Sequence, residues 1–240
     1  MKVLWGFKKI KNLRGSCLSI GIFDGLHLGH RRIIRALVKK AREESLKSIL
    51  ISFHPHPQGE KLIFDLEERV EAIEALGIDY LILVRFNREF SLISPHKFLD
   101  EYLVKRLKVK YLYVGENFQF GKNKTGNVKL LKIFSKKFGF KLRVFRLLKK
   151  DSYLISSTNL RKFVQRADLK RVSKLLGRPL EFKGKVIKGE GVARTLGFPT
   201  ANLVYPKDRV FLPAGVYKAR IYFLDKSFLG LVYIGTRPTF

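Results

Sequence analysis

Residues 21–30, with the sequence GIFDGLHLGH, constrain the fold of this 240-residue chain more than any other stretch. They follow an apolar run typical of a short buried strand and precede a helical pattern that begins near His30. Glycines in such a turn let the backbone approach a ligand, and the helix directs its free N–H groups and positive dipole end at an anion. His27 and His30 can reach one phosphate group from there.

The stretch therefore predicts a phosphate site in a nucleotide enzyme. The alternative is an ordinary strand-to-helix turn with solvated histidines. Besides the two histidines, the candidate nucleotide-binding residues of this turn are Gly21, Phe23, Asp24, Gly25 and Gly29.

Strands and helices alternate as far as about residue 165, which predicts a doubly wound α/β domain with a parallel sheet. The predicted strands are 18–23, 49–53, 80–84, 111–114 and 142–148, and the predicted helices are 30–46, 65–76, 94–103, 128–138 and 168–176. From residue 178 onward the pattern contains strands alone, at 182–187, 216–224 and 228–234. We predict two domains, 1–177 and a smaller all-β domain over 178–240.

Several local signals set the helix ends. Asp65 with Glu68 three residues later forms a capping-box pattern, and Ser94-Pro95 is typical of an N-cap followed by the first helical residue. Gly139 is expected at the C-cap of the helix 128–138.

Residues 54–57, HPHP, follow the second strand and place two more histidines in a loop held by prolines. Since parallel strands end at one edge of a sheet, four histidines are expected to converge there, neutral or charged near physiological pH. The alternative is that His54 and His56 are loop residues without a ligand.

Two later segments carry polar groups that suit a nucleotide. The loop 115–126 contains Asn117 and two lysines, and its alternative interpretation is an ordinary connection. In residues 155–161, ISSTNLR, Ser157 and Thr158 precede Arg161 by about one turn, an arrangement that suits a polyphosphate.

In the second domain, a glycine-flanked loop leads to Thr200 and Asn202. Their oxygens could hold a hard cation such as Mg²⁺ on a nucleotide, although oxygen donors are also common in loops without a metal.

The formal net charge is +29, from 49 Lys and Arg against 20 Asp and Glu. Such a charge implies anionic partners, whether nucleotides, RNA, DNA or an anionic membrane surface, and solvated surface is its default explanation. Cys17 is the only cysteine, which excludes an internal disulfide and favours a small buried residue. Without a membrane-length apolar run or a secretory signal, the protein is expected in the cytoplasm.

Five motifs in this order resemble the bacterial bifunctional riboflavin kinase/FMN adenylyltransferases, from about residue 18 to the last residue. They are GIFDGLHLGH, HPHP, GENFQFG, ISSTNLR and LGFPTANL. The resemblance implies transfer of AMP from ATP to FMN, giving FAD and pyrophosphate, with phosphorylation of riboflavin by the second domain.

The resemblance also implies roles for single residues. His27 and His30 would stabilise the α-phosphate of ATP during in-line attack by the FMN phosphate, with Mg²⁺ neutralising charge. The other implied groups are Asn117, Ser157, Thr158 and Arg161 for ATP, Pro55, His56 and Pro57 for the flavin, and Gly197, Thr200 and Asn202 for ATP and metal in the kinase domain.

The kinase domain departs from the family pattern at Val192 and Ala193, where a basic residue and a glycine are usual. The chain also stops at Phe240, before the family's β-barrel closes and before its catalytic glutamate. We therefore expect a truncated chain or a kinase-defective relic, with exposed apolar side chains such as Leu231 and Ile234.

Two alternatives differ in class from this interpretation. One is a nucleotidyltransferase of the same superfamily acting on another phosphate acceptor. The other is a basic nucleic-acid-binding protein that reuses the fold, which we consider the weaker one, since charge alone does not require His27, His30 and Arg161 in phosphate-binding contexts. The sequence does not predict an oligomeric state.

Overall fold

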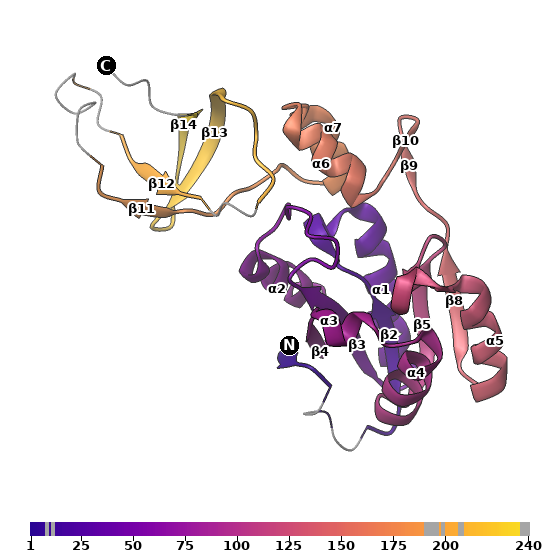
Figure 1. The fold of residues 1–240 in the computed structure, drawn as a ribbon. Helices are drawn as coiled ribbons and strands as arrows, with labels where there is room; N and C mark the ends of the chain where they lie inside the picture. Colours follow the sequence, from indigo (N-terminus) through magenta and orange to yellow (C-terminus); the bar gives the residue numbers. More distant parts are fainter. Residues whose placement is uncertain (8–9, 11–12, 190–196, 198–199, 206–208, 236–240) are drawn as a thin grey trace.

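The structure is a computed structural model that describes residues 1–7, 10, 13–189, 197, 200–205 and 209–235. Its centre is a six-stranded, all-parallel sheet with the order β1-β4-β3-β2-β5-β8 (Figure 1). The strands are β1 (Lys2–Trp5), β2 (Ser16–Ile20), β3 (Lys47–His54), β4 (Tyr80–Arg85), β5 (Val109–Gly115) and β8 (Lys141–Phe145).

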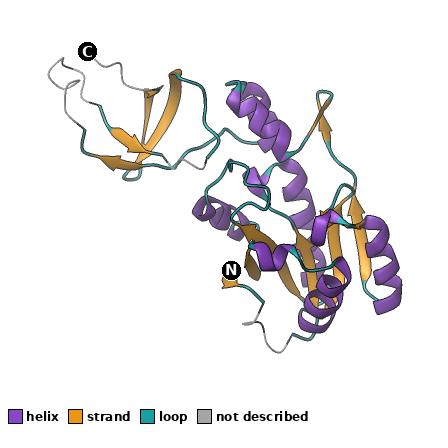
Figure 2. Cartoon of the chain, in the orientation of Figure 1, coloured by secondary structure: helices purple, strands orange, loops and turns teal. Residues whose placement is uncertain are grey.

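Helices cover both faces of this sheet, as Figure 2 shows. One face packs on α1 (Leu28–Glu43) and α2 (Leu66–Glu74), and the other on η2 (Phe98–Arg106) and α5 (Val128–Phe138). The helices α6 (Ser157–Gln165) and α7 (Leu169–Leu176) join the first of these two cores beyond the edge of the sheet. Neighbouring residues of one strand enter different cores, since Leu50 joins the first cluster while Ile49 and Ile51 join the second. The predicted doubly wound α/β class is confirmed.

The strand order reverses direction at β2. The chain runs from β2 to β3 and β4 on one side and then returns to place β5 and β8 on the other side. The space beyond the carboxyl ends of β2 and β5 is therefore the topological switch point, where open α/β sheets bind ligands. The turn of residues 21–27 lies at this point.

The local capping signals were predicted correctly. Asp65 and Glu68 form the reciprocal capping box of α2, and Ser94 caps α4 (Pro95–Lys97), which leads directly into η2. Gly139 ends α5 with a left-handed φ of 72°.

Other boundaries differ from prediction. Helix α1 begins at Leu28 rather than near His30, because His27 caps it, and β2 ends at Ile20, because Phe23 adopts a φ of 56°. The edge strand β1 was not predicted. The remaining elements of this region are η1 (Asp24–Leu26), α3 (Arg88–Ser91), β6 (Gln119–Phe120), η3 (Lys122–Lys124), β7 (Gly126–Asn127), β9 (Lys149–Lys150) and β10 (Tyr153–Leu154).

The described residues after 177 form two small antiparallel sheets. One pairs β11 (Lys185–Ile187) with β12 (Asn202–Val204), and the other pairs β13 (Gly215–Phe223) with β14 (Lys226–Ile234). The first predicted strand of this region, 182–187, was too long, because its backbone pairs with β12 only from Lys185 onward. The Phe182 ring packs on the rings of Tyr205 and Phe211. Strand β12 was not predicted.

Apolar side chains are exposed on these small sheets, as expected for Leu231, which is 73% exposed. Ile234, in contrast, is partly buried against the first core. Val210 and Leu212 are buried within that same core. Residues of the predicted second domain thus complete the packing of the first.

Candidate active site

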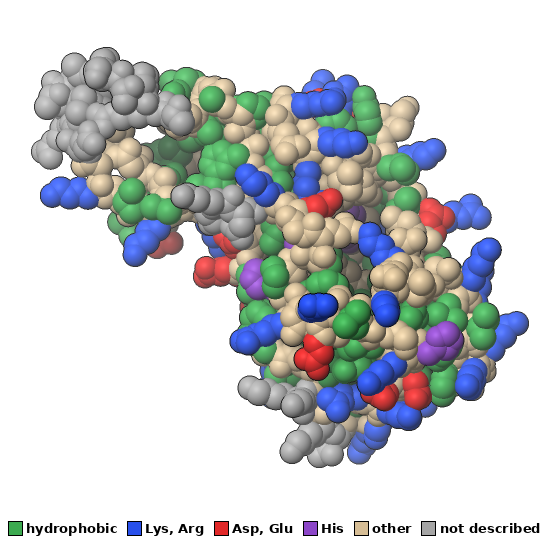
Figure 3. Space-filling model, in the orientation of Figure 1, with side chains coloured by type: hydrophobic (Ala, Val, Ile, Leu, Met, Phe, Trp, Pro, Cys, Tyr) green, Lys and Arg blue, Asp and Glu red, His purple; other side chains and the backbone are tan. Residues whose placement is uncertain are grey.

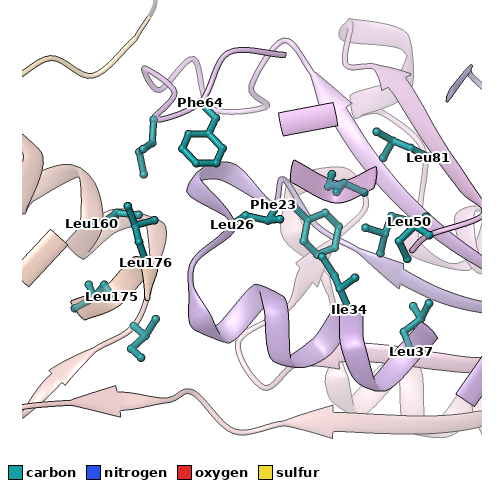
Figure 4. Close-up of a cluster of buried hydrophobic side chains, with 14 of the residues drawn as sticks. Phe23, Leu26, Ile34, Leu37, Leu50, Phe64, Leu81, Leu160, Leu175 and Leu176 are labelled. Atoms are coloured by element: carbon teal, nitrogen blue, oxygen red, sulfur yellow. The ribbon is translucent and has the colours of Figure 1, made fainter. Parts of the chain in front are cut away.

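The turn after β2 is bent by two left-handed residues. Phe23 has a φ of 56° and Gly25 a φ of 72°. The Phe23 ring is buried beside Ile34 of α1, and Leu26 lies between Phe23 and Leu160 of α6 (Figure 4). This packing fixes the backbone of the turn and leaves the start of α1 at the edge of the sheet.

Gly25 of this turn packs closely against side chains from two other segments. A Cβ atom on Gly25 would lie 2.8 Å from Cδ2 of Leu160 and 3.1 Å from Cδ1 of Ile63. Gly25 is thus required by its positive φ and by close packing of the protein against itself. A Cβ atom on Gly21 would lie 3.3 Å from the Phe23 ring, and one on Gly29 would lie 3.1 Å from the His27 ring, so both contacts are less severe than that at Gly25.

His27 and His30 form a stacked pair at the N-terminus of α1. Their ring centroids are 3.7 Å apart, with 15° between the ring planes. His27 is the N-cap residue, and its Nδ1 accepts a hydrogen bond of 3.2 Å from the backbone N–H of His30. That Nδ1 is therefore unprotonated, and the neutral ring carries its proton on Nε2.

Burial favours the neutral form of both histidines. Burial lowers the pKa of His27 from 6.5 to about 4. Burial also lowers the pKa of His30 well below its usual range, with further contributions from His27 and the positive charge of Arg161. Nδ1 of His30 is buried without a hydrogen-bond partner among the described residues. The pair thus has hydrogen-bonding capacity that the described protein does not use.

Arg161 on α6 is held beside this pair by three groups. Its Nη2 lies 2.8 Å from Oδ2 of Asp24, its Nη1 lies 2.5 Å from Oε2 of Glu60, and its Nε donates to the Lys61 carbonyl at 2.9 Å. The guanidinium is only 12% exposed. This arrangement fixes the plane of a guanidinium at a helix N-terminus.

Asp24 is fully buried, and its carboxylate is bonded to groups of the protein interior. It accepts hydrogen bonds from the backbone N–H groups of Ile63 and Phe64, at 2.9 and 3.1 Å, in addition to the Arg161 ion pair. In this arrangement Asp24 orients Arg161.

The N-terminus of α6 is joined to the same turn. Ser156 caps the helix, and the hydroxyl of Ser157 donates to the Asp24 carbonyl at 3.0 Å. Thr158 is exposed in the first helical turn. Two helix N-termini, those of α1 and α6, therefore lie at the switch point with the guanidinium of Arg161.

The HPHP loop approaches Arg161 from the end of β3. Nδ1 of His56 accepts a hydrogen bond from the Gln58 N–H, and its Nε2 lies 3.8 Å from Oε2 of Glu60. Burial, and next the charge of Arg161, lower the pKa of His56. His54 instead contacts the ring of Trp5. Of the four expected histidines, His30 and His56 thus feel the charge of Arg161, and His27 stacks on His30. Pro55 is exposed, and Pro57 is half-buried.

The other candidates lie further along the chain. Asn117 is exposed two residues after β5, at the same sheet edge. Gly197, Thr200 and Asn202 are exposed in the β11–β12 region, so the structure does not join them to the histidine pair through any described contact. The departures at Val192 and Ala193 lie outside the described residues.

Three functional groups were missed from the sequence. Arg69 of α2 is fully buried and donates to the carbonyls of Ile22 and Phe53, at the ends of β2 and β3. Glu60 and Arg209 were missed as well. The helical pattern of 65–76 shows only that Arg69 is a charged residue on the buried side of the helix. Its partners, the carbonyls of Ile22 and Phe53, are distant in the chain, so neighbouring residues do not indicate them.

Cys17 is buried in β2, as predicted, and burial raises the pKa of its thiol to about 12. Among the described residues, no three His, Cys, Asp or Glu side chains are grouped so that they could bind a metal. In the same part of the chain, no helix is long and apolar enough to cross a membrane.

Comparison with family models assigns both parts of the chain. Residues 9–159 match the model of FAD synthetase, and residues 176–240 match the model of riboflavin kinase.

Relatives from several bacteria carry the name bifunctional riboflavin kinase/FMN adenylyltransferase. That of Buchnera aphidicola subsp. Schizaphis graminum is 35% identical over 100% of this chain and 80% of its own length. That of Escherichia coli K12 is 34% identical over 100% of this chain and 79% of its own. A crystal structure described as a macrolide-efflux protein from Streptococcus pneumoniae matches with a TM-score of 0.87 and 26% identity, over 99% of this chain and 80% of that one.

Proposed function

Since the chain belongs to the family of bifunctional riboflavin kinase/FMN adenylyltransferases, we propose that its first region adenylylates FMN at the His27–His30 pair. The observation that carries this proposal is the stacked, neutral pair at the N-terminus of α1, beside the fixed guanidinium of Arg161. Substrates in this proposal are ATP and FMN, and products are FAD and pyrophosphate.

The reaction requires positioning more than covalent chemistry. An oxygen of the FMN phosphate forms a bond to the α-phosphorus of ATP, the bond from that phosphorus to the bridging oxygen of the β-phosphate breaks, and pyrophosphate leaves. No protein nucleophile is needed, so catalysis consists of alignment and stabilisation of developing charge.

The histidines suit the α-phosphate because they are neutral donors in a partly closed site. Nε2–H of His27 can donate to a phosphate oxygen, while its Nδ1 stays bonded to the His30 N–H. A bound polyphosphate favours the protonated ring, so its arrival raises the pKa of both histidines. The pair thereby gains positive charge when the substrate is present.

Arg161, Ser157, Thr158 and Asn117 are the proposed contacts for the rest of ATP. Arg161 keeps its plane through buried Asp24 and the Lys61 carbonyl, whereas its second carboxylate partner, Glu60, is exposed and can be replaced by a phosphate. The remaining turn residues, Gly21, Phe23, Gly25 and Gly29, shape the backbone that ATP approaches. Pro55, His56 and Pro57 are proposed for the flavin side.

Magnesium fits this site only when it is bound to the phosphates of ATP. Asp24 is buried with its partners, and Glu60 pairs with Arg161, so these two carboxylates are engaged within the protein. A divalent ion there would neutralise charge on the triphosphate.

The second region is proposed to phosphorylate riboflavin, in keeping with its family model. Thr200 and Asn202 expose neutral oxygens that suit Mg²⁺ bound to a nucleotide, and Gly197, with a φ of 83°, shapes the preceding loop. A cytoplasmic location is also proposed, in keeping with the membership of this family.

Basic side chains do not concentrate in one area of the visible surface. In Figure 3, Lys and Arg are spread over that face between apolar and polar groups. The face drawn in Figure 3 therefore lacks the stripe or patch of charge that is typical of a nucleic-acid interface, and we do not propose one there.

Two assays test the proposal. FMN with Mg-ATP measures FAD and pyrophosphate, and riboflavin with Mg-ATP measures FMN. His30→Ala is expected to retain the fold and to lower FAD formation by about 100-fold or more. The matched control His96→Ala removes an exposed histidine of α4 and should leave the rate unchanged. Near-normal turnover of His30→Ala at saturating substrates would refute the assignment of that residue.

A further inference from the structure

Arg209 connects the second region to the phosphate site. It follows β12 in the chain, yet it is 1% exposed and pairs with Leu62 in an isolated parallel bridge. The next residue, Val210, donates its N–H to the Leu62 carbonyl at 2.7 Å and is itself buried. The segment around Arg209 is thus packed on the loop that precedes α2.

Both Nη atoms of Arg209 contact that loop and α2, whereas its Nε is buried without a hydrogen-bond partner among the described residues. Its Nη2 donates to the Ile63 carbonyl at 2.7 Å and lies 2.8 Å from Oε2 of Glu68. Its Nη1 lies 3.4 Å from Oδ2 of Asp65. The rings of Phe182 and Tyr205, with centroids 5.4 and 5.1 Å away, contact the guanidinium. Two carboxylates and a carbonyl therefore bind one buried cation.

The loop that Arg209 contacts also binds Asp24, through its backbone N–H groups. Arg209 binds the carbonyl of Ile63, and the N–H groups of Ile63 and Phe64 bind Asp24. Asp24 in turn binds Arg161. Direct contacts therefore run from Arg209 to the guanidinium that faces the polyphosphate, through one residue of the loop and one buried carboxylate.

We propose that Arg209 is a positioning residue for adenylyl transfer: by fixing Ile63, it fixes Asp24 and so the orientation of Arg161. Arg209 does not touch the substrate in this scheme. The inference rests on the proposed function of the first region. It means that the segment after β12 contributes a positioning residue to the adenylyltransferase site.

The chain offers a matched control for this contact. Lys183 also comes from the second region, and its Nζ binds Glu71 of α2, but both side chains are exposed and neither touches the loop 62–64 in the described contacts. Lys183→Met removes a contact between the same two regions without reaching Ile63. Its KM for Mg-ATP should equal that of the original chain.

The experiment uses the full chain and measures kcat and the KM for Mg-ATP during FAD synthesis. Arg209→Met is expected to raise this KM about tenfold while the KM for FMN changes less than twofold. Arg209→Lys keeps the charge but has one nitrogen in place of a planar fork, so it should raise the KM by about threefold.

A double-mutant cycle separates positioning from mere destabilisation. If Arg209 acts through Arg161, adding Arg209→Lys or Arg209→Met to Arg161→Met should cause no further rise in KM. Additive effects, or an unchanged KM in folded single variants, would overturn the inference. If Arg209→Met does not fold, the double-mutant cycle is measured with Arg209→Lys and Arg161→Met. Absence of FAD synthesis by the original chain would instead overturn the proposed function itself.

Discussion

Nη2 of Arg161 lies 2.8 Å from Oδ2 of Asp24, although 137 residues separate them in the chain. Asp24 is fully buried, and Arg161 is 12% exposed. The pair joins the turn after β2 to the first turns of α6. It therefore connects the two helix N-termini that form the candidate phosphate site.

Asp24→Asn is expected to lower the free energy of unfolding by about 3 kcal/mol. Both carboxylate oxygens receive N–H groups, so the amide NH₂ of asparagine must face a donor in either orientation. Denaturant unfolding measures the loss. The control Asp100→Asn breaks an ion pair of 2.7 Å with Lys105 on the surface and should cost less than about 1 kcal/mol. Equal losses in both variants would contradict this interpretation.

Helix ends that are set by neighbouring residues can be predicted from the sequence. The capping box of Asp65 and Glu68, the Ser94-Pro95 start and the Gly139 end all follow from groups within four positions of each other. The doubly wound sheet also follows, since its alternating strands and helices have distinct periodicities.

Contacts between distant segments leave no such local mark. The Asp24–Arg161 pair and the Arg209–Ile63 contact join segments 137 and 146 residues apart. The edge strand β1 is four residues long and mostly exposed, and its three apolar residues, 3–5, are too few to distinguish a strand from a loop. The turn at the topological switch point could thus be located from the sequence, but the groups that hold Arg161 could not.

Gly25→Ala should destabilise the fold more than Gly59→Ala. Both glycines have a positive φ, 72° and 65°, so both substitutions strain the backbone by about 1 kcal/mol. Only the new Cβ at position 25 meets other atoms, at 2.8 Å from Leu160, while position 59 has none within 4 Å. We expect a further loss of about 1–3 kcal/mol at position 25. Equal unfolding midpoints for the two variants would disprove the packing role of Gly25.

Stability should fall as the pH is lowered from 6.5 to 4. His27 is neutral in the folded state because its pKa is lowered to about 4, whereas the unfolded chain takes up the proton near its ordinary 6.5. The unfolded state therefore binds more protons between these values, and above 6.5 this group contributes no pH dependence. The pKa difference corresponds to about 3 kcal/mol by pH 4.

His27→Asn tests this pH dependence because asparagine is a good N-cap that does not titrate. Its free energy of unfolding should decline less steeply than that of the original chain over the same pH range. His96→Gln, at an exposed position, should leave the slope unchanged. An identical slope in the His27 variant would show that this histidine is not buried in neutral form.

Cys17 should be almost inert to thiol reagents while the chain is folded. Burial, with a smaller contribution from the negative charge of Glu44, raises its pKa from 9.0 to about 12. At pH 8 the thiolate population is therefore about 1,000-fold smaller than for an ordinary thiol, and the reagent also has no access to the buried sulfur. Labelling in denaturant should give one thiol per chain, because Cys17 is the only cysteine. Gly25→Ala should speed labelling under native conditions, since a less stable fold opens more often, whereas rapid labelling of the original folded chain would show that β2 is accessible.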